Sequence, residues 1–334
     1  MIGPADLEYA LPAELIAQAP IAPRDAARLL LLERATGRLA ELRFADLAER
    51  VGPRDLVVVN DTRVLPAKLR GRKASGGKAE ALLLERRPDA TWTAFVRARG
   101  RLAPGLELVF GALLARVEDV LPGGTCRIAL SRADGGSADA LVDALGEAPL
   151  PPYISRESAR AQDLADYQTI FAREPGAVAA PTASLHFTPE LAAKLRIATL
   201  TLHVGPGTFR PIRCERLEEH ALAAERFCVP EATARAIAQT RAAGGRVIAV
   251  GTTVVRALET TGGEAGAGDT KLLILPGHEF RVVDSLVTNF HLPGSSLLAL
   301  VMAFAGVAAT KRAYAHAIAQ RFRFFSSGDA LWIS

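Results

Sequence analysis

The sequence has little cysteine and no long apolar run. Its three cysteines, at positions 126, 214 and 228, are too few and too far apart for a disulfide framework or a zinc cluster, so we expect them to pack as small hydrophobic residues. The longest apolar stretch, residues 297–305, is far too short to span a bilayer. Acidic residues stand near the N-terminus, where a signal peptide would carry positive charge and an apolar run. The sequence therefore predicts a cytoplasmic protein.

The sequence also lacks the short motifs that mark several large enzyme classes. No G-x-x-x-x-G-K-[ST] or G-x-G-x-x-G segment follows a predicted strand, which removes support for a nucleoside triphosphate or dinucleotide site. There is no H-E-x-x-H pair for zinc and no G-x-S-x-G turn for a nucleophilic serine. We therefore expect no metal ligand set and no obvious protein nucleophile.

What is present suits a folded protein with an uneven charge. The chain has 334 residues, of which 49% are hydrophobic and 23% charged, enough for a sizeable core and one or two domains. The net charge is +4, and in residues 67–101 ten basic residues stand against three acidic ones. The basic residues there are Lys68, Arg70, Arg72, Lys73, Lys78, Arg86, Arg87, Arg97, Arg99 and Arg101. This surplus predicts either a nucleic-acid footprint or an ordinary solvated face, and the sequence favours neither.

Two parts of the sequence predict a layered α/β domain. Near the N-terminus, residues 28–33 and 38–43 predict a β-hairpin, and residues 55–59 predict a buried strand. The C-terminal half predicts strands at 197–204, 246–250, 271–275 and 281–287 and helices at 231–243, 253–259, 296–305 and 311–322. Strands that alternate with helices are typical of layered α/β architecture.

Between these parts the pattern changes. Residues 66–149 contain short alternating runs that are broken by Pro-Asp, Pro-Gly and Gly-Gly turns, which predicts a small antiparallel barrel or sandwich. The proline cluster at 149–152 is interpreted as the linker through which the chain returns to the α/β domain. The expected fold class is therefore α/β (α+β): a layered α/β main domain, made of residues 1–65 plus 150–334, with a small antiparallel β-barrel domain inserted at 66–149.

Most residues that are capable of chemistry directly follow predicted strands. The four segments are Asn60-Asp61-Thr62-Arg63, Gly205-Pro206-Gly207-Thr208-Phe209-Arg210, Gly251-Thr252-Thr253 and Thr288-Asn289-Phe290-His291. In open α/β sheets, ligands bind outside the carboxyl ends of the strands. If the four strands are parallel neighbours, these loops line one crevice.

Each of these signals also has a purely structural explanation. Residues 251–253 suit a tight turn with a helix N-cap, or a set of exposed amides that holds a carboxylate or phosphate. His203 ends a strand and His186 precedes a predicted helix, and packing is the default role at such positions. Asp329 suits a turn. The clustering of the signals, rather than any single one, indicates a functional site.

Six long segments resemble the signature segments of the S-adenosylmethionine:tRNA ribosyltransferase-isomerases of queuosine biosynthesis. They are residues 55–67 (DLVVVNDTRVLPA), 180–187 (APTASLHF), 202–211 (LHVGPGTFRP), 250–256 (VGTTVVR), 283–293 (VDSLVTNFHLP) and 323–330 (RFFSSGDA). They are colinear, and the resemblance runs from residue 23 to the end of the chain without a large gap. Several long motifs in the same order make chance a poor explanation.

The resemblance implies a two-domain protein and a specific reaction. The ribosyl part of S-adenosylmethionine, a consumed substrate, would move onto the aminomethyl group of 7-aminomethyl-7-deazaguanine in a tRNA anticodon and rearrange to the epoxycyclopentane of epoxyqueuosine, releasing adenine and methionine. The nucleophile is the substrate's amine, so no serine or cysteine nucleophile is needed. The sulfonium already acidifies the neighbouring C5′ proton, so no metal is needed either.

The resemblance also assigns roles to residues. Proton transfer would fall to His186, His203, His291 and Asp61. The methionine carboxylate would be held by Arg63, Arg210 or Arg256, together with the amides of residues 251–253. Phe209 or Phe290 would stack on a base. The early basic barrel strands would hold tRNA phosphates while the anticodon base is splayed into the pocket. The full set of expected substrate-binding residues is Asn60, Thr62, Arg63, Thr182, Gly205, Gly207, Thr208, Phe209, Arg210, Gly251, Thr252, Thr253, Arg256, Asp284, Thr288, Asn289, Phe290 and Asp329.

The chain departs from the family pattern at four positions. The family has glycine where Ser184 stands, a second histidine where Ala223 stands, and tyrosines at Phe322 and Ser327. A serine at position 184 would reshape its loop if that position needs positive φ. The departures at Ser184 and Ala223 motivate one alternative, a non-catalytic RNA-binding protein with the same fold. A second alternative, in which the basic stretch is only a solvated face, is an unrelated transferase that acts on a small nucleoside.

Overall fold

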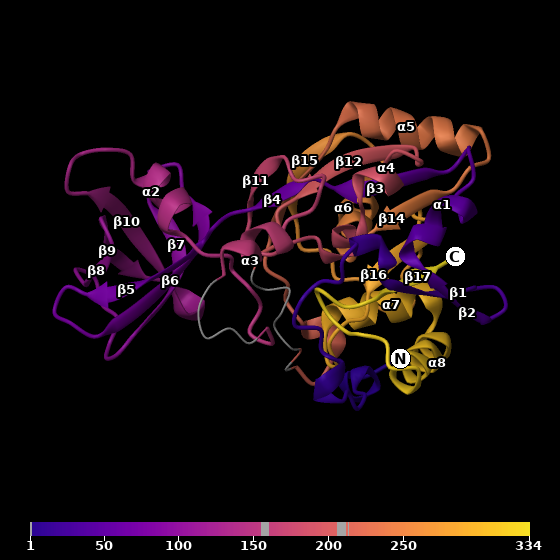
Figure 1. The fold of residues 1–334 in the computed structure, drawn as a ribbon, viewed down its shortest axis with the longest axis horizontal. Helices are drawn as coiled ribbons and strands as arrows, with labels where there is room; N and C mark the ends of the chain where they lie inside the picture. Colours follow the sequence, from indigo (N-terminus) through magenta and orange to yellow (C-terminus); the bar gives the residue numbers. More distant parts are fainter. Residues whose placement is uncertain (1, 155–159, 206–211, 213) are drawn as a thin grey trace.

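The computed structural model describes residues 2–154, 160–205, 212 and 214–334, and shows a large α/β body with a smaller barrel at one end (Figure 1). The body contains a nine-stranded sheet. Its strands, from edge to edge, are β15 (Gly266–Thr270), β13 (Glu225–Val229), β12 (Ile197–Leu202), β3 (Leu56–Asn60), β14 (Val247–Val250), β16 (Ser285–Asn289), β17 (Ala330–Ile333), β1 (Arg28–Leu32) and β2 (Leu39–Arg43).

The four central strands of this sheet, β12, β3, β14 and β16, are parallel to one another. The carboxyl ends of all four strands therefore lie along the same side of the sheet. The outer strands mix directions, because β13, β15 and β2 run antiparallel to the strand beside them and β17 is antiparallel to β16. The structure is thus a mixed α/β protein, as expected.

The central strands are apolar throughout because both faces of the sheet are covered. On β3, Leu56 and Val58 face one hydrophobic layer, while Val57 and Val59 face the other. The first layer is completed by α5 (Glu231–Ala242), α6 (Thr252–Thr261), α7 (Ser296–Ala305) and α8 (Val307–Ala319). The second is completed by α1 (Leu47–Arg50), α4 (Pro189–Ala192) and the 3₁₀ turn η6 (Thr182–His186). A strand with a continuous β-branched run therefore fits the middle of this sandwich.

Six antiparallel strands close a barrel outside the main sheet. They are β5 (Lys68–Lys73), β6 (Lys78–Arg86), β7 (Trp92–Ala98), β8 (Glu107–Phe110), β9 (Leu113–Val120) and β10 (Thr125–Arg132). Gly71 permits the closure between β5 and β8, since a Cβ atom there would stand 2.0 Å from the Val109 carbonyl oxygen. The division of the chain into two domains stays a prediction.

Short elements join these parts. They are β4 (Thr62–Val64), α2 (Ala138–Leu145), α3 (Ala161–Asp166), β11 (Glu174–Ala177) and the 3₁₀ turns η1 (Pro4–Leu7), η2 (Ala13–Leu15), η3 (Arg24–Ala26), η4 (Phe44–Asp46), η5 (Pro122–Gly124) and η8 (Leu217–Glu219). Strands β4 and β11 pair with each other beside the barrel (Figure 1).

One predicted strand is wrong. Residues 271–275 form no strand, because their backbone bonds to side chains: Leu272 N–H donates to Thr270 Oγ1 at 3.2 Å, and Leu272 O accepts from Arg256 Nε at 2.9 Å. The strand expected at 281–287 begins only at Ser285. Cys126 is buried as expected, whereas Cys228 is exposed.

Among the described residues, no single helix has the length and hydropathy to cross a bilayer. Helices α7 and α8 meet that test only jointly, and they are bent by 114° relative to each other.

Candidate functional site

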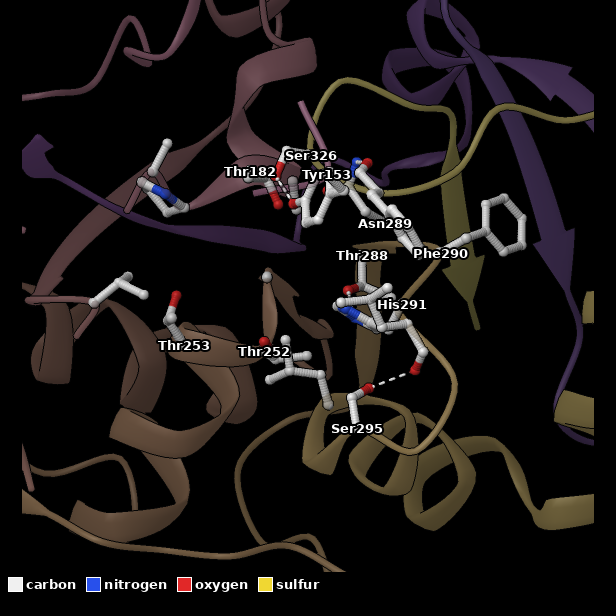
Figure 2. Close-up of a pocket in the computed structure, with 18 residues that line it drawn as sticks. Tyr153, Thr182, Thr252, Thr253, Thr288, Asn289, Phe290, His291, Ser295 and Ser326 are labelled. Carbon is white, nitrogen blue, oxygen red and sulfur yellow. Dashed lines mark hydrogen bonds between the residues drawn. The ribbon is translucent and has the colours of Figure 1, made fainter. Parts of the chain in front are cut away.

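The carboxyl ends of β12, β14 and β16 open onto one cleft, whereas the loop after β3, the fourth loop expected there, does not line it. Its empty space, open solvent included, is about 650 Å³. The polar residues that line it are Tyr153, Thr182, Thr252, Thr253, Thr288, Asn289, His291, Ser295 and Ser326 (Figure 2). We call it the central cleft.

The turn after β14 brings a helix start to the cleft. Gly251 has φ +96°, a conformation that side chains rarely adopt, and its N–H donates to Val287 O at 2.8 Å. Helix α6 begins at the next residue, so the buried Thr252 and Thr253 and the free amides of the first turn face the cleft. Such a terminus suits negative or electron-rich ligand groups.

His291 lies on the β16 side of the cleft. Its Nε2 lies 2.8 Å from Thr288 Oγ1, and its backbone N–H donates to the Tyr314 hydroxyl at 2.9 Å. The Tyr9 hydroxyl donates to its carbonyl oxygen. Burial lowers the pKa of His291 to about 3, so the imidazole is neutral at neutral pH. Thr288 thus contacts the imidazole itself, while Tyr314 and Tyr9 hold the backbone of His291 at the cleft.

Phe290 does not stack on a ligand as expected. Its side chain is fully buried, packs against Phe322, Phe324 and Tyr314, and points away from the cleft (Figure 2). The aromatic wall of the cleft is instead made by Phe325 and Tyr153, whose rings lie 4.9 Å apart.

Tyr153, Phe325 and Ser326 are cleft residues that sequence reasoning missed. The Tyr153 hydroxyl bonds Ser326 Oγ, and burial raises the pKa of that tyrosine to about 12. Phe325 adopts φ +70°, a strained conformation for a side-chain-bearing residue and one that often marks a functional site. Segment 323–330, which resembles a family signature, offered a signal for Phe325 and Ser326, whereas Tyr153 follows a segment that was interpreted as a linker.

The loop after β3 supports the cleft rather than lining it. Asn60 is fully buried; its Nδ2 donates to Leu202 O at 2.8 Å and Thr253 Oγ1 at 3.2 Å, and its Oδ1 accepts from the backbone of Leu202 and Thr62. Asp61 Oδ1 accepts from Thr201 Oγ1 at 2.7 Å. Asn60 thus ties β12 and α6 together, and neither residue reaches the central cleft.

His203 lies in a different hollow, between the barrel and the body. We call it the barrel hollow; its walls include Thr93 and Thr125 from the barrel and Arg226 from β13. His203 Nδ1 lies 2.8 Å from Thr62 Oγ1, and the ring packs so closely on Gly176 that a Cβ there would stand 2.8 Å from it. Burial and the Arg226 charge lower the pKa of His203, so it too is neutral at neutral pH.

His186 is buried behind the cleft. Its ring stacks at 4.9 Å on Phe44, and its Nε2 lies 3.2 Å from Asn289 Nδ2. Burial first, then the charges of Arg323 and Arg24, lower its pKa to about 3. It does not line the cleft and contacts it through Asn289, which does, and its role in proton transfer stays a prediction.

Arg256, one of the three arginines expected to hold the methionine carboxylate, is buried and already pairs with an acidic side chain. It is 6% exposed, and its Nη1 pairs with the carboxylate of Glu225, whose Oε1 also accepts from Gly205 N–H at 2.9 Å. Arg63 is exposed on β4 and lines no part of the cleft.

Asp284 and Asp329, two residues expected to bind substrate, accept hydrogen bonds from backbone N–H groups. Asp284 precedes β16, at the opposite edge of the sheet, and its carboxylate accepts from Val247 N–H at 2.7 Å. Asp329 accepts from the backbone N–H groups of Arg28 and Arg323, at 3.0 and 2.8 Å. The expected ligand residues Gly207, Thr208, Phe209 and Arg210 lie outside the described residues.

The four departures from the family pattern have different settings. Ser184 has no positive φ, so serine does not reshape its turn, but its hydroxyl is buried without a hydrogen-bond partner among the described residues. Ala223 is exposed at the mouth of the barrel hollow. Phe322 is fully buried in the core, and Ser327 is half-buried.

The basic stretch forms part of the barrel's outer surface. Several of its charges are paired: Lys68 with Glu80 at 3.4 Å and Arg70 with Glu147 at 2.9 Å. Lys68, Arg70 and Arg97 line a broad groove that ends at residues 149–152. No group of three or more His, Cys, Asp or Glu side chains is placed to hold a metal ion in the described part of the chain.

Comparison with known proteins shows the family. The sequence model of the family described as "Queuosine biosynthesis protein" matches residues 5–333. The chain belongs to this family. Among its relatives, the S-adenosylmethionine:tRNA ribosyltransferase-isomerase of Anaeromyxobacter dehalogenans (strain 2CP-1 / ATCC BAA-258) is 50% identical over 339 residues, which cover 98% of each chain. The protein of the same name from Moorella thermoacetica is 48% identical over 341 residues, again 98% of each chain.

A solved structure is similar as well. The crystal structure of S-adenosylmethionine tRNA ribosyltransferase from Thermotoga maritima is 36% identical, has a TM-score of 0.56, and covers 98% of this chain and 100% of its own. The queuosine biosynthesis family therefore accounts for the whole length of the chain.

Proposed function

We propose that this chain is an S-adenosylmethionine:tRNA ribosyltransferase-isomerase. It transfers the ribosyl group of S-adenosylmethionine to the aminomethyl nitrogen of 7-aminomethyl-7-deazaguanine in a tRNA anticodon and rearranges that group to an epoxycyclopentane. The C5′–sulfur bond, the bond from C1′ to adenine and the C1′–O4′ ring bond break. Bonds form from C1′ to the aminomethyl nitrogen, from C1′ to C5′ and from C5′ to O4′. C5′ and the amine each lose a proton, adenine takes one up, and methionine and adenine leave. Because its substrate is tRNA, the reaction takes place in the cytoplasm.

The observation that carries this proposal is the central cleft. It joins a helix start, an aromatic wall and a neutral histidine at one sheet edge, and the chain matches its named relatives from end to end. The donor's nucleoside suits the wall of Tyr153 and Phe325, and the sulfonium supplies the acidity at C5′. The protein then needs to position the reactants, exclude water and move protons.

His291 is the proposed base at the donor, because it lies in the cleft and is neutral. His203 is the proposed proton carrier for the RNA amine, because the barrel hollow lies between the cleft-bearing body and the basic barrel. Val204, which directly follows His203, lines both the barrel hollow and the central cleft. The two histidines thus serve two substrates at adjoining sites.

The barrel, taken as a separate domain at about residues 66–149, is the proposed tRNA contact. Lys68 and Arg70 in the groove pair with Glu80 and Glu147, so the exposed Arg97 is the cation proposed to meet a backbone phosphate there. The barrel hollow suits a base that is splayed out of its loop. The Gly176 contact fixes His203 there. His203→Ala is expected to fold normally and to lose about 10²- to 10⁴-fold in turnover.

The experiment is adenine release, followed by liquid chromatography. Purified protein and S-adenosylmethionine are incubated with an anticodon stem-loop that carries either 7-aminomethyl-7-deazaguanine or guanine. Adenine and methionine released only with the modified RNA support the proposal. Salt-sensitive binding of the RNA without adenine release would support a non-catalytic RNA-binding protein instead.

A further inference from the structure

A second pocket adjoins the central cleft. It has about 430 Å³ of empty space, open solvent included, and Arg256 is among the residues that line it, so we call it the Arg256 pocket. Three segments contribute to both sites: residues 204–205, residues 252–256 and residues 295–297, the last with Leu297 in both walls. Thr252 and Arg256 are one turn apart on α6, so they lie on the same face of that helix, one in each site. The two sites are therefore neighbouring parts of one elongated space.

The Arg256 guanidinium keeps one donor unused. Nη1 pairs with Glu225, and Nε donates to Leu272 O at 2.9 Å. Nη2 is buried and has no hydrogen-bond partner in the described part of the chain. An unsatisfied buried donor is costly, so a ligand with an acceptor oxygen would be stabilised at this point.

The other residues that line the pocket indicate which kind of ligand it binds. Its walls are mostly apolar, with Leu222, Ile274 and Leu300 among them, so it suits a short hydrocarbon chain. Its two charges are opposite: the Arg256 cation and the Glu225 carboxylate lie against each other at one end. A zwitterionic ligand group can place its anion against Arg256 and its cation against Glu225. A ligand that carries only a negative charge would also be repelled by the Glu225 carboxylate.

We propose that the Arg256 pocket binds the amino-acid end of S-adenosylmethionine. The ligand carboxylate accepts from Arg256 Nη2, its ammonium faces Glu225, and its methylenes lie against the leucines. The sulfonium then stands where the pocket meets the central cleft at Leu297, with the ribose and adenine beyond it. This inference rests on the proposed function, and it makes the donor's carboxylate a determinant of donor recognition.

The first test uses the unaltered protein and two donors. S-adenosylmethionine and its decarboxylated form share the sulfonium, ribose and adenine, and differ only in the carboxylate. We measure kcat/KM for adenine release with each donor on the modified stem-loop. Loss of a hydrogen bond to a charged group is expected to lower kcat/KM for the decarboxylated donor by about 10- to 100-fold.

A matched pair of variants locates the effect. Arg256→Lys keeps a cation beside Glu225 but removes Nη2, so the ratio of kcat/KM between the two donors should fall to near one. Arg246→Lys is the control: Arg246 also pairs with a buried carboxylate, Asp55, at 2.7 Å, but at the opposite edge of the sheet. It should keep the full preference of the wild-type protein.

The outcomes separate the inference from the proposed function. Equal kcat/KM for the two donors in the wild-type protein would overturn the inference while leaving the function in place. A preference that survives in Arg256→Lys would also overturn it, because the carboxylate would then be held elsewhere. Absence of adenine release from S-adenosylmethionine itself would instead contradict the proposed function. If Arg256→Lys does not fold, the wild-type comparison of donors still decides.

Discussion

The buried imidazole of His186 should make the protein sensitive to acid. The side chain is 4% exposed, and burial beside the Arg323 and Arg24 charges lowers its pKa to about 3. In the unfolded chain the pKa of histidine returns to about 6.5. Because the folded pKa is the lower one, the stability is present above pH ~6.5 and is lost as the pH falls from there toward about 3.

The size of this loss follows from proton linkage. Below the unfolded pKa, the unfolded chain binds one proton that folded His186 does not bind, which costs about 1.4 kcal/mol per pH unit. Between about pH 7.5 and about pH 5, His186 alone should therefore remove about 2 kcal/mol of the free energy of unfolding. That is a large fraction of the roughly 5–15 kcal/mol by which ordinary domains are stable.

The assay is urea unfolding at the two pH values, with His186→Gln against wild type. Glutamine does not titrate, so this variant should lose about 2 kcal/mol less than wild type on acidification, whatever its stability at neutral pH. His316→Gln is the control, because His316 lies on the surface of α8 beside Glu41 and its removal leaves the buried imidazole in place. An unchanged acid loss in His186→Gln would refute the reasoning.

Two further predictions follow from single side chains. Ser184→Ala should raise the free energy of unfolding by about 1 kcal/mol, because it removes a buried hydroxyl without a hydrogen-bond partner among the described residues; chemical denaturation measures this, and a loss of stability would contradict it. Arg97→Ala should weaken binding of the stem-loop and reduce the magnitude of the slope of log K against log salt by about one. Arg235→Ala on α5 is the control and should leave the slope unchanged. Equal slopes in wild type and both variants would show that Arg97 does not contact the RNA.

Much of the fold could be predicted from the local pattern of residues. The run at 55–59 predicted a buried strand because β-branched residues suit a sheet that is covered on both faces, and helix 296–305 was predicted with the bounds that α7 has. Strand β5 was missed, because its sequence KLRGRK has one apolar large residue and is held by barrel pairing on both sides. The strand expected at 271–275 failed because side chains from Arg256 and Thr270 bind its backbone instead.

The site was predicted in its place but not in its details. Residues at the ends of parallel strands gather at one edge by geometry, so the cleft followed once the four strands were recognised. Sequence does not say which way a loop residue points: Phe290 lines the cleft but its ring packs into the core, and His186 lies behind the cleft. Tyr153 reaches the cleft only through tertiary contacts with Phe325 and Ser326, which no local pattern reports.

The central claim is that the ribosyl group itself is transferred to the RNA base. The most direct measurement is mass spectrometry of nucleosides from the digested stem-loop, after reaction with S-adenosylmethionine whose ribose carries ¹³C. The account predicts that the label appears on the modified nucleoside, with one adenine and one methionine released for each labelled base. Label that stays with the released small molecules, or a methyl group on the RNA, would contradict it.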